Sequence, residues 1–375
     1  MGTLTATITI QDEPAPDLFL PLLELEVEED YRLASAFRIK LAISREDDGL
    51  WKMLDDERIR LWNKIAISVA MDEEQELIRG YITHLKPHIQ PDENGSTLEI
   101  VGMDDTCLMS LEEKIKDWPN KSDSDIAKEI FDNYHFESNP GSEIDDTAIV
   151  HDEAVSTIMQ RETDIHFLKR LARRNGYECF VKGGKGFFRK PVLSGEPQPV
   201  LAAHFGTETN LMKFEATVNA LRPAAVEIHQ IGTIAKEIRD AVVEAAEQPP
   251  LGRDAGPALP VPQSIVPYLF VKHAVTTGQP EMETLCKALF EEAQWFIEAR
   301  GELNTVCYGA VLEARKLVPI KGVGELFSGL YYVTKVRHLF KPDEYTQQFE
   351  ARRNALAPSG AEDFGGDGGL LGGAV

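Results

Sequence analysis

The chain has 375 residues, and its 39 lysines and arginines stand against 62 aspartates and glutamates, a formal net charge of −23. Hydrophobic residues make up 43% and charged residues 27%, a globular composition that excludes a collagen-like, coiled-coil or wholly disordered chain. The length suffices for roughly two or three domains, and the negative charge repels phosphates, so we expect no stable nucleic-acid binding.

The sequence predicts neither a membrane segment nor a cleaved leader, because it contains no apolar stretch of about 20 residues and no basic, apolar start. Its four cysteines show no CxxC spacing, and we expect them to be buried free thiols in a reducing compartment. These cysteines are Cys107, Cys179, Cys286 and Cys307.

The first part of the chain is predicted to be a β unit. Leu, Ile and Val recur in runs and alternations between charged turns over residues 18–101, and Asn94-Gly95 is a strong hairpin signal. We assign residues 1–17 to an N-terminal extension and residues 18–105 to the first β domain.

Helical periodicity begins near residue 106. Ser124 is expected to cap one helix and Thr163 a second, which ends at Gly176. The following YECFVKGGKGFFRKP predicts a hairpin rather than a phosphate-binding loop, because the glycines lie between two strands. We therefore expect an inserted α+β domain at residues 106–205.

Strand patterns return in the last third of the chain, interrupted by helical and proline-rich segments. Strands are predicted at 211–234, 303–313, 316–321, 328–340 and 344–352, helices at 235–247 and 281–299, and a proline-rich loop or arm at 249–267. The corresponding domains are a second β domain (206–235 and 300–355), a helical and proline-rich insertion (236–299) and a flexible glycine-rich tail (356–375).

The chain contains one near-repeat, YITHLK at 81–86 and YVTKVR at 332–337, each followed by a similar strand, TLEI at 97–100 and TQQF at 346–349. Equivalent β units in the two halves would give one chain two copies of one interaction surface. The alternative is that Tyr/Val/Thr-rich strands commonly look alike.

No catalytic pattern is present. The nine histidines are dispersed, and no nucleophile has a recognisable His and Asp partner set. The acidic doublets Asp104-Asp105 and Asp145-Asp146 are expected to be solvated turns. We predict a protein that is not an enzyme, with no catalytic, cofactor-binding or metal-binding residues; the alternative is a glycan or peptidoglycan hydrolase with an acidic pair as acid and base.

Two segments resemble signatures of the phage late control D and VgrG family. Residues 160–177 are similar to its Q-x-E-[ST]-D-x-x-F-L-x-R-L-…-G signature, and residues 327–338 to its closing F-S-G-x-Y-x-V-T-x-V-x-H motif. The residues to which we give a structural role are Gln160, Glu162, Asp164, Phe167, Leu168, Leu171, Gly176, Gly329, Tyr332, Val333, Thr334 and His338.

The resemblance implies an α+β, mainly β fold, with two tube-like β-barrel domains in one chain and an inserted α+β domain. It implies the baseplate hub of a contractile injection machine: a phage tail, a type VI-like apparatus or an extracellular contractile particle. The alternative is then a hub-associated glycan or peptidoglycan hydrolase. Such hubs are homotrimers that adapt a sixfold inner tube to a threefold spike.

The implied partners are other copies of the chain, the inner tube protein, a separate spike protein and other baseplate proteins. The spike is expected to be separate because VgrG proteins continue into an OB-fold and a β-helical needle, whereas this chain ends soon after Arg353. We expect synthesis in the cytoplasm and assembly into the particle.

Overall fold

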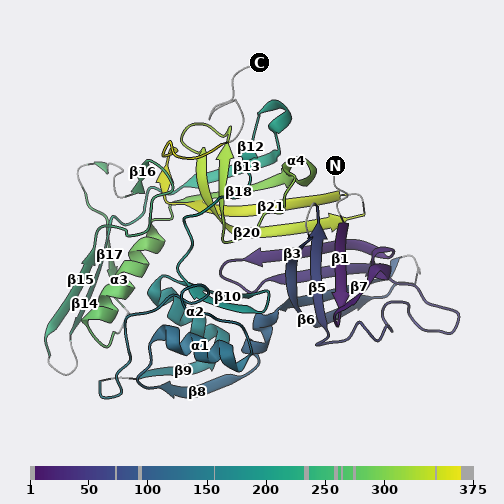
Figure 1. Ribbon diagram of the computed structural model, residues 1–375, viewed down its shortest axis with the longest axis horizontal. Coiled ribbons are helices and arrows are strands. Elements are labelled where there is room, and N and C mark those ends of the chain that lie inside the picture. Colours follow the sequence, from purple (N-terminus) through teal and green to yellow (C-terminus); the bar gives the residue numbers. More distant parts are fainter. Residues whose placement is uncertain are drawn as a thin grey trace.

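The computed structural model describes residues 5–71, 74–91, 95–155, 157–231, 236–256, 261–262, 265–272, 276–342 and 344–364. The protein is mainly β with a few helices, and its largest sheet has 13 strands. In Figure 1 this sheet runs from the N-terminal strands to β20 and β21, with smaller helical units beside it. No helix in the described part of the chain is long and apolar enough to cross a membrane.

The N-terminal part of the main sheet alternates buried and exposed residues, as predicted. In β4, Phe37, Ile39 and Leu41 are buried while the residues between them face outward. Its strands are β1 (Thr5–Ile10), β2 (Glu13–Pro14), β3 (Leu22–Asp30), β4 (Ala36–Ala42), β5 (Lys64–Ala70), β6 (Glu74–His88) and β7 (Thr97–Asp104). Because β1 pairs with β5, the predicted N-terminal extension contains a strand of the sheet.

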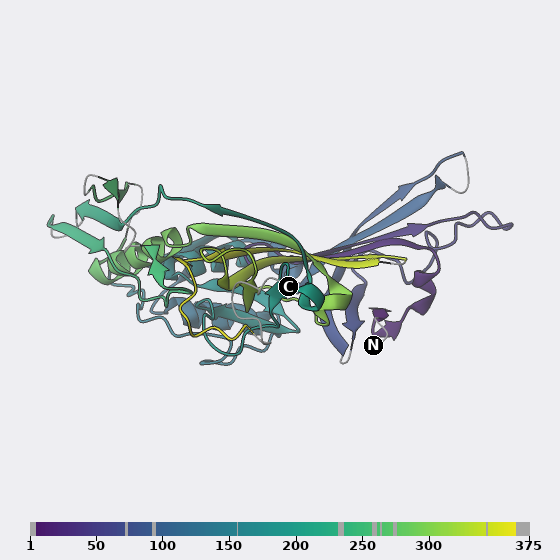
Figure 2. The same cartoon turned by 90° about the horizontal axis from the view of Figure 1, so that it is seen from above.

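The hairpin predicted around Asn94-Gly95 joins β6 and β7, which pair antiparallel. Asn94 itself lies outside the described residues. Short 3₁₀ helices flank the strands: η1 (Pro16–Phe19), η3 (Asp105–Ser110) and η4 (Gly206–Glu208). In Figure 2 the far ends of β6 and β7 extend away from the body of the molecule.

The C-terminal strands belong to the same sheet. They are β12 (Leu201–Ala202), β13 (Leu211–Val218), β18 (Ile297–Asn304), β19 (Leu317–Lys321), β20 (Gly329–Lys341) and β21 (Glu344–Arg353). The order β13-β18-β21-β20-β3-β4-β7-β6-β5-β1-β2 shows where the two parts join. The expected pair of separate barrels is thus replaced by one continuous sheet with no closed barrel among the described strands, because β20 pairs antiparallel with β3.

The α+β unit consists of β8 (Glu113–Trp118), α1 (Asp123–Asn133), β9 (Ile158–Thr163), α2 (Asp164–Asn175), β10 (Glu178–Lys182) and β11 (Lys185–Arg189). The hairpin of β10 and β11 confirms its prediction. The expected cap at Ser124 is wrong by two residues: α1 is capped by Ser122, which exchanges hydrogen bonds with Asp125 in a capping box. Thr163 is the N-cap residue of α2, but its side chain makes no capping bond.

A third unit packs α3 (Gln279–Ala293) on a small sheet of β14 (Ala225–Ile231), β15 (Ile238–Val243) and β17 (Tyr268–Val271). The predicted helix at 235–247 is wrong, because β15 pairs with β14 and buries Ala241 against α3. Two further strands, β16 (Asp254–Ala255) and β22 (Ala355–Leu356), pair with each other.

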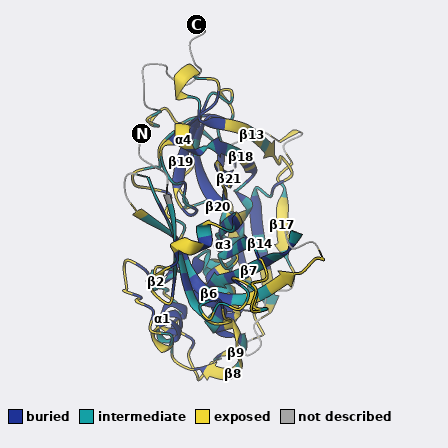
Figure 3. Cartoon of the chain, turned by 90° about the vertical axis from the view of Figure 1, so that its right-hand side faces the viewer, coloured by how far each residue is buried: buried dark blue, intermediate teal, exposed yellow. Residues whose placement is uncertain are grey.

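Two other boundaries differ from the prediction. The helix expected to reach residue 299 ends at Ala293, and residues from Ile297 onward form β18 between β13 and β21. The strand expected at 303–313 is wrong beyond Asn304, where β18 ends and α4 (Thr305–Tyr308) begins, and no described strand follows before β19. Figure 3 shows the resulting burial: dark blue residues concentrate in β20 and β21, whereas β17 is mostly exposed. Part of the predicted glycine-rich tail, residues 365–375, lies outside the described residues.

Candidate functional site

The polar residues of the first motif form a buried network at the corner between β9 and α2. The Asp164 carboxylate accepts hydrogen bonds from Gln160 Nε2 (2.7 Å) and Tyr134 Oη (2.8 Å), and it pairs with Lys114. Gln160 is fully buried and its Oε1 accepts from Trp118 Nε1 (3.2 Å). Every side chain here has partners inside the protein, so these residues fix the local fold.

The remaining residues of the first motif place α2. The helix buries three motif side chains completely: Phe167, Leu168 and Leu171. Gly176 ends α2 with φ of 70°, and a Cβ there would lie 3.4 Å from Ala288 Cβ on α3. Glu162 lies at the surface and pairs with Arg170 at 2.7 Å, a contact of small energy.

The second motif begins β20 at a backbone position that requires glycine. Gly329 has φ of 138°, and a Cβ there would overlap the Arg353 guanidinium. Arg353 is fully buried and donates hydrogen bonds to the carbonyls of Leu251, Ser328 and Ala357. The close approach of Gly329 therefore allows an arginine to tie together three chain segments.

Tyr332 connects β20 to the α+β unit. Its hydroxyl lies 2.8 Å from both carboxylate oxygens of Glu178 on β10, and both residues are buried. Burial raises the pKa of Glu178. The structure thus brings the two motifs together through the strand that follows α2.

The other residues of the second motif lie along β20. Val333 is fully buried in the core of the C-terminal strands. The Thr334 carbonyl accepts from Tyr31 N (2.9 Å) beside β3. His338 Nδ1 lies 2.8 Å from Tyr345 Oη, and burial lowers the pKa of His338 to about 4, so the ring is neutral at pH 7.

The β20–β3 junction is a ladder with charged pairs on one face. Residues 335–340 of β20 lie opposite residues 25–30 of β3. Arg337 pairs with Glu26 at 2.5 Å, and Lys335 pairs with Glu28 at 2.8 Å. Opposite charges across neighbouring strands favour this register.

A buried ion cluster lies beneath the junction, and sequence patterns did not reveal it. Glu29 of β3 pairs with Lys182 of β10 (2.8 Å) and with Arg315, which precedes β19 (3.2 Å). It also accepts from Ala314 N (3.0 Å). Burial alone would raise the pKa of Glu29, but the two cations hold it below its ordinary value of 4.5. One carboxylate therefore links the N-terminal strands, the α+β unit and the C-terminal strands.

Five strands in each part of the sheet have the same order of neighbours: β3-β4-β7-β6-β5 and β13-β18-β21-β20-β19. The near-repeat lies in equivalent places, on β6 and β20. The ladder shifts register between Ile82 and His84 on β6, and between Val333 and Lys335 on β20, so each repeat has its threonine at the irregularity.

The correspondence continues on the outer strands. Register shifts occur between Leu22 and Glu24 on β3, and between Leu211 and Lys213 on β13. Beyond the shifts, Glu26 lies opposite Arg38 in the first part, and Glu215 lies opposite Arg300 in the second. Both opposed pairs are ion pairs, so the two halves share pairing partners, irregularities and one charge pair.

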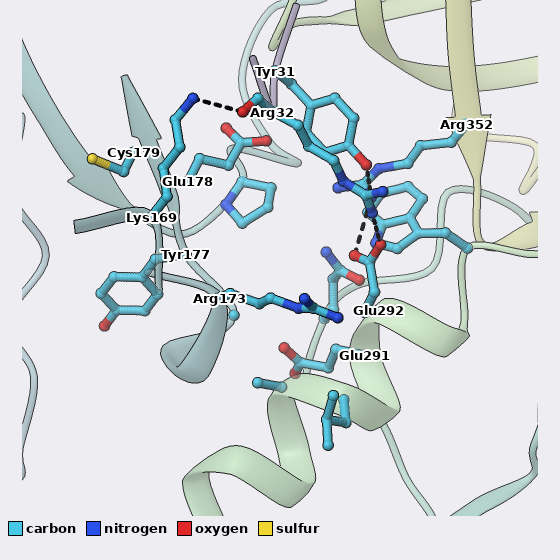
Figure 4. A pocket seen from close by; sticks show the side chains of 16 residues that line it. Tyr31, Arg32, Lys169, Arg173, Tyr177, Glu178, Cys179, Glu291, Glu292 and Arg352 are labelled. Carbon is cyan, nitrogen blue, oxygen red and sulfur yellow. Dashed lines mark hydrogen bonds and ion pairs between the residues drawn. The ribbon is translucent and has the colours of Figure 1, made fainter. Parts of the chain in front are cut away.

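A cavity of about 350 Å³ lies where α2, α3 and the β3–β4 loop meet, as Figure 4 shows. Glu292 pairs there with Arg32 and, at 3.1 Å, with Arg352. The Arg352 guanidinium lies over the rings of Tyr31 (4.5 Å) and Trp295 (4.2 Å). These contacts hold α3 against β21 and the β3–β4 loop, a structural role.

The acidic doublets do not form a substrate cleft. Asp104 is buried and accepts from Ser35 N (2.6 Å) and Thr106 N (3.0 Å), while Asp145 accepts from Lys190 N (2.9 Å). The cavity beside Asp104 and Asp105 holds only about 20 Å³, far below the roughly 300–1,000 Å³ of a site that binds a small molecule. Over the described ranges, no three His, Cys, Asp or Glu side chains are placed to hold one metal ion.

The cysteine prediction holds for three residues. Cys107, Cys179 and Cys286 are buried free thiols, whereas Cys307 is exposed in α4.

Known structures share this fold over nearly the whole chain. The 43 kDa tail protein of prophage MuSo2 from Shewanella oneidensis matches with a TM-score of 0.69 and 12% identity, covering 94% of this chain and 100% of that one. The E. coli c3393 protein, a type VI secretion component described as similar to the T4 phage tail proteins gp27 and gp5, matches with a TM-score of 0.54 and 13% identity over 95% of this chain and 79% of that one.

A VgrG-containing structure, the lidded Francisella PdpA-VgrG complex, matches with a TM-score of 0.52 and 12% identity, covering 95% of this chain and 53% of that one. The fold is thus that of phage tail proteins of the gp27 and VgrG type, which confirms the resemblance seen in the sequence. No curated protein matches the sequence. The family model described as the Alg8 N-terminal domain matches residues 1–341, and the chain belongs to that family.

Proposed function

We propose that this protein is a structural baseplate hub of a contractile injection machine, and that three copies form a ring. The observation that carries the proposal is the pair of five-stranded units with equal strand order and register within one chain. Three chains would supply six such units, which is the number needed to meet a sixfold tube with equivalent contacts.

The parts that are not repeated would contact partners of lower symmetry. The α+β unit lies between the two strand units along the chain, whereas the unit of α3 with β14, β15 and β17 is inserted within the second strand unit, between β13 and β18. Among the described elements, each occurs once per chain. A ring of three chains therefore presents three copies of each unit, and these suit a threefold spike and other baseplate proteins. We retain here the division into tube-like domains, insertions and tail predicted from the sequence. We also propose that the protein is a component of a phage tail or injection particle.

We also propose that the protein acts by binding and catalyses no reaction. The conspicuous buried carboxylates support this role: Asp104 caps a 3₁₀ helix, Asp164 braces α2, and Glu29 joins three parts of the chain. Each makes hydrogen bonds or ion pairs within the protein, as structural carboxylates do.

Mass measurement of the purified protein, alone and with the tube protein of the same machine, tests this function. We expect a trimer that binds the tube protein, and electron microscopy of the mixture should show a ring on the tube end. A strict monomer that leaves the tube protein unbound and hydrolyses peptidoglycan would refute the proposal.

A further inference from the structure

One edge of β6 is covered only along its first half. β5 pairs with β6 as far as Tyr81, and the Trp62–Asn63 segment continues this coverage to Ile82. Beyond Ile82, β6 has β7 on one side, and no described strand pairs with residues 83–88 on the other. On β20 the equivalent stretch is occupied, because β3 pairs with residues 335–340.

The complementary edge lies at the opposite end of the sheet. β13 is the equivalent of β3, and it pairs with β18 on one side. It ends the strand order, so among the described strands nothing pairs with its other side, the side by which β3 binds β20. Unpaired strand edges bind other strands readily unless they are protected.

We propose that residues 83–88 of β6 pair antiparallel with β13 of a second copy of this chain, in the register that β20 and β3 use within one chain. This inference rests on the proposed function for the closure of the ring. Transferring the register places Leu85 opposite Val218, Lys86 opposite Thr217 and His88 opposite Glu215.

Charge and exposure favour this partner. Lys86 takes the place of Arg337, and Glu215 takes the place of Glu26, so the ion pair of the intrachain junction has its counterpart between chains. Lys86 and Glu215 are both exposed in the single chain. The same register brings the exposed Ile89 against Phe214, as Phe340 lies against Leu25.

The geometry also explains closure. Among the described strands, each chain has one unpaired β6 edge and one unpaired β13 edge, and these are different surfaces, so the contact is head to tail. Head-to-tail contacts produce a closed ring when the rotation closes. In such a ring, junctions within chains and between chains alternate with the same register at each, except that Pro87, which takes the place of His338, has no N–H to donate to the partner strand.

A disulfide test measures the register directly. In a Cys307→Ser background, Lys86→Cys with Thr217→Cys places the two thiols opposite each other across the new ladder. We expect oxidation to convert most of the chain into covalent oligomers, up to the trimer, with an 86–217 disulfide peptide in the mass spectrum. The control, Lys86→Cys with Val218→Cys, offsets the second thiol to the other face and should remain mostly monomeric on a denaturing gel.

A second test uses charge. Lys86→Glu should weaken self-association by on the order of 10-fold, and adding Glu215→Lys should restore it, because like charges across a ladder repel. Lys128→Glu, on the exposed face of α1, is the matched control and should leave association unchanged.

The outcomes separate this inference from the proposed function. A native trimer that shows no 86–217 cross-link, or that cross-links equally at 86–218, overturns the strand pairing and leaves the hub function standing. A chain that remains monomeric, with or without the tube protein, overturns both.

Discussion

Replacement of the buried Glu29 tests the idea that one carboxylate holds three parts of the chain together. Glu29→Ala leaves Arg315, itself buried, and Lys182 without their shared partner, and removes the acceptor of Ala314 N. Breaking a buried ion pair in this way costs about 3–5 kcal/mol, because an uncompensated charge stays in a region of low polarity. We expect the free energy of unfolding to fall by about that amount.

The contribution of Glu29 to stability should decrease as the pH falls. The pKa of Glu29 is lower in the folded protein than its ordinary value of 4.5, so its stabilising effect is complete above about pH 4.5. That effect is lost as the pH falls through the folded pKa. The stability of the natural protein should therefore drop more steeply below pH 4.5 than that of Glu29→Ala.

Urea unfolding at equal protein concentration, at pH 7 and in steps down to pH 3, measures both effects. Asp132→Ala is the control, because Asp132 pairs with Lys128 in an exposed contact on α1 that is worth about 0.3–0.5 kcal/mol. A loss for Glu29→Ala no larger than that of the control, with parallel pH profiles, would refute the reasoning.

Three other changes test the motif residues. Leu168→Ala should lower the free energy of unfolding in urea by about 2–5 kcal/mol, because the side chain is fully buried. The control Leu111→Ala, at an exposed position, should lower it by less than about 0.5 kcal/mol. Equal losses would contradict the packing of α2. His338 has a pKa of about 4 in the folded protein, below its ordinary 6.5, so its contribution to the free energy of unfolding is complete above pH 6.5 and declines as the pH falls to 4. His338→Gln should remove this decline in stability, which amounts to up to about 3 kcal/mol. An unchanged dependence of stability on pH would exclude His338 as its source. Gly329→Ala should lower the free energy of unfolding by about 1–3 kcal/mol, because φ is 138° and the new Cβ overlaps Arg353. An unchanged free energy of unfolding would show that the backbone at the start of β20 can move to accept the Cβ.

Local sequence patterns predicted much of the fold. Alternating apolar residues located β4 and β6, and the helical spacing of Ile165, Leu168 and Leu171 located the buried face of α2. Gly176 marked the end of α2, since a left-handed residue is needed there. Such features depend on neighbours within a few positions along the chain, so periodicity alone can identify them.

The sequence also identified residues of structural importance, but it indicated only the class of protein and not the contacts that these residues make. The motif around Gln160 and the motif around Tyr332 indicated a class of protein, and the likeness of 81–86 to 332–337 indicated repeated strands. No sequence pattern predicted the hydrogen bond between Tyr332 and Glu178, or the ion pairs of Glu29 with Lys182 and Arg315. These partners are separated by more than a hundred residues.

Tertiary structure decided the cases in which local preference was overruled. Residues 238–243 have a helix-like composition but form β15, because pairing with β14 and burial of Ala241 under α3 outweigh propensity. Likewise, the two strand units join into one sheet because β20 pairs antiparallel with the edge of β3. The sequence by itself determined which strands and helices the chain can form. Only the three-dimensional arrangement decided which edges and charges meet, because those contacts depend on distance in space and not along the chain.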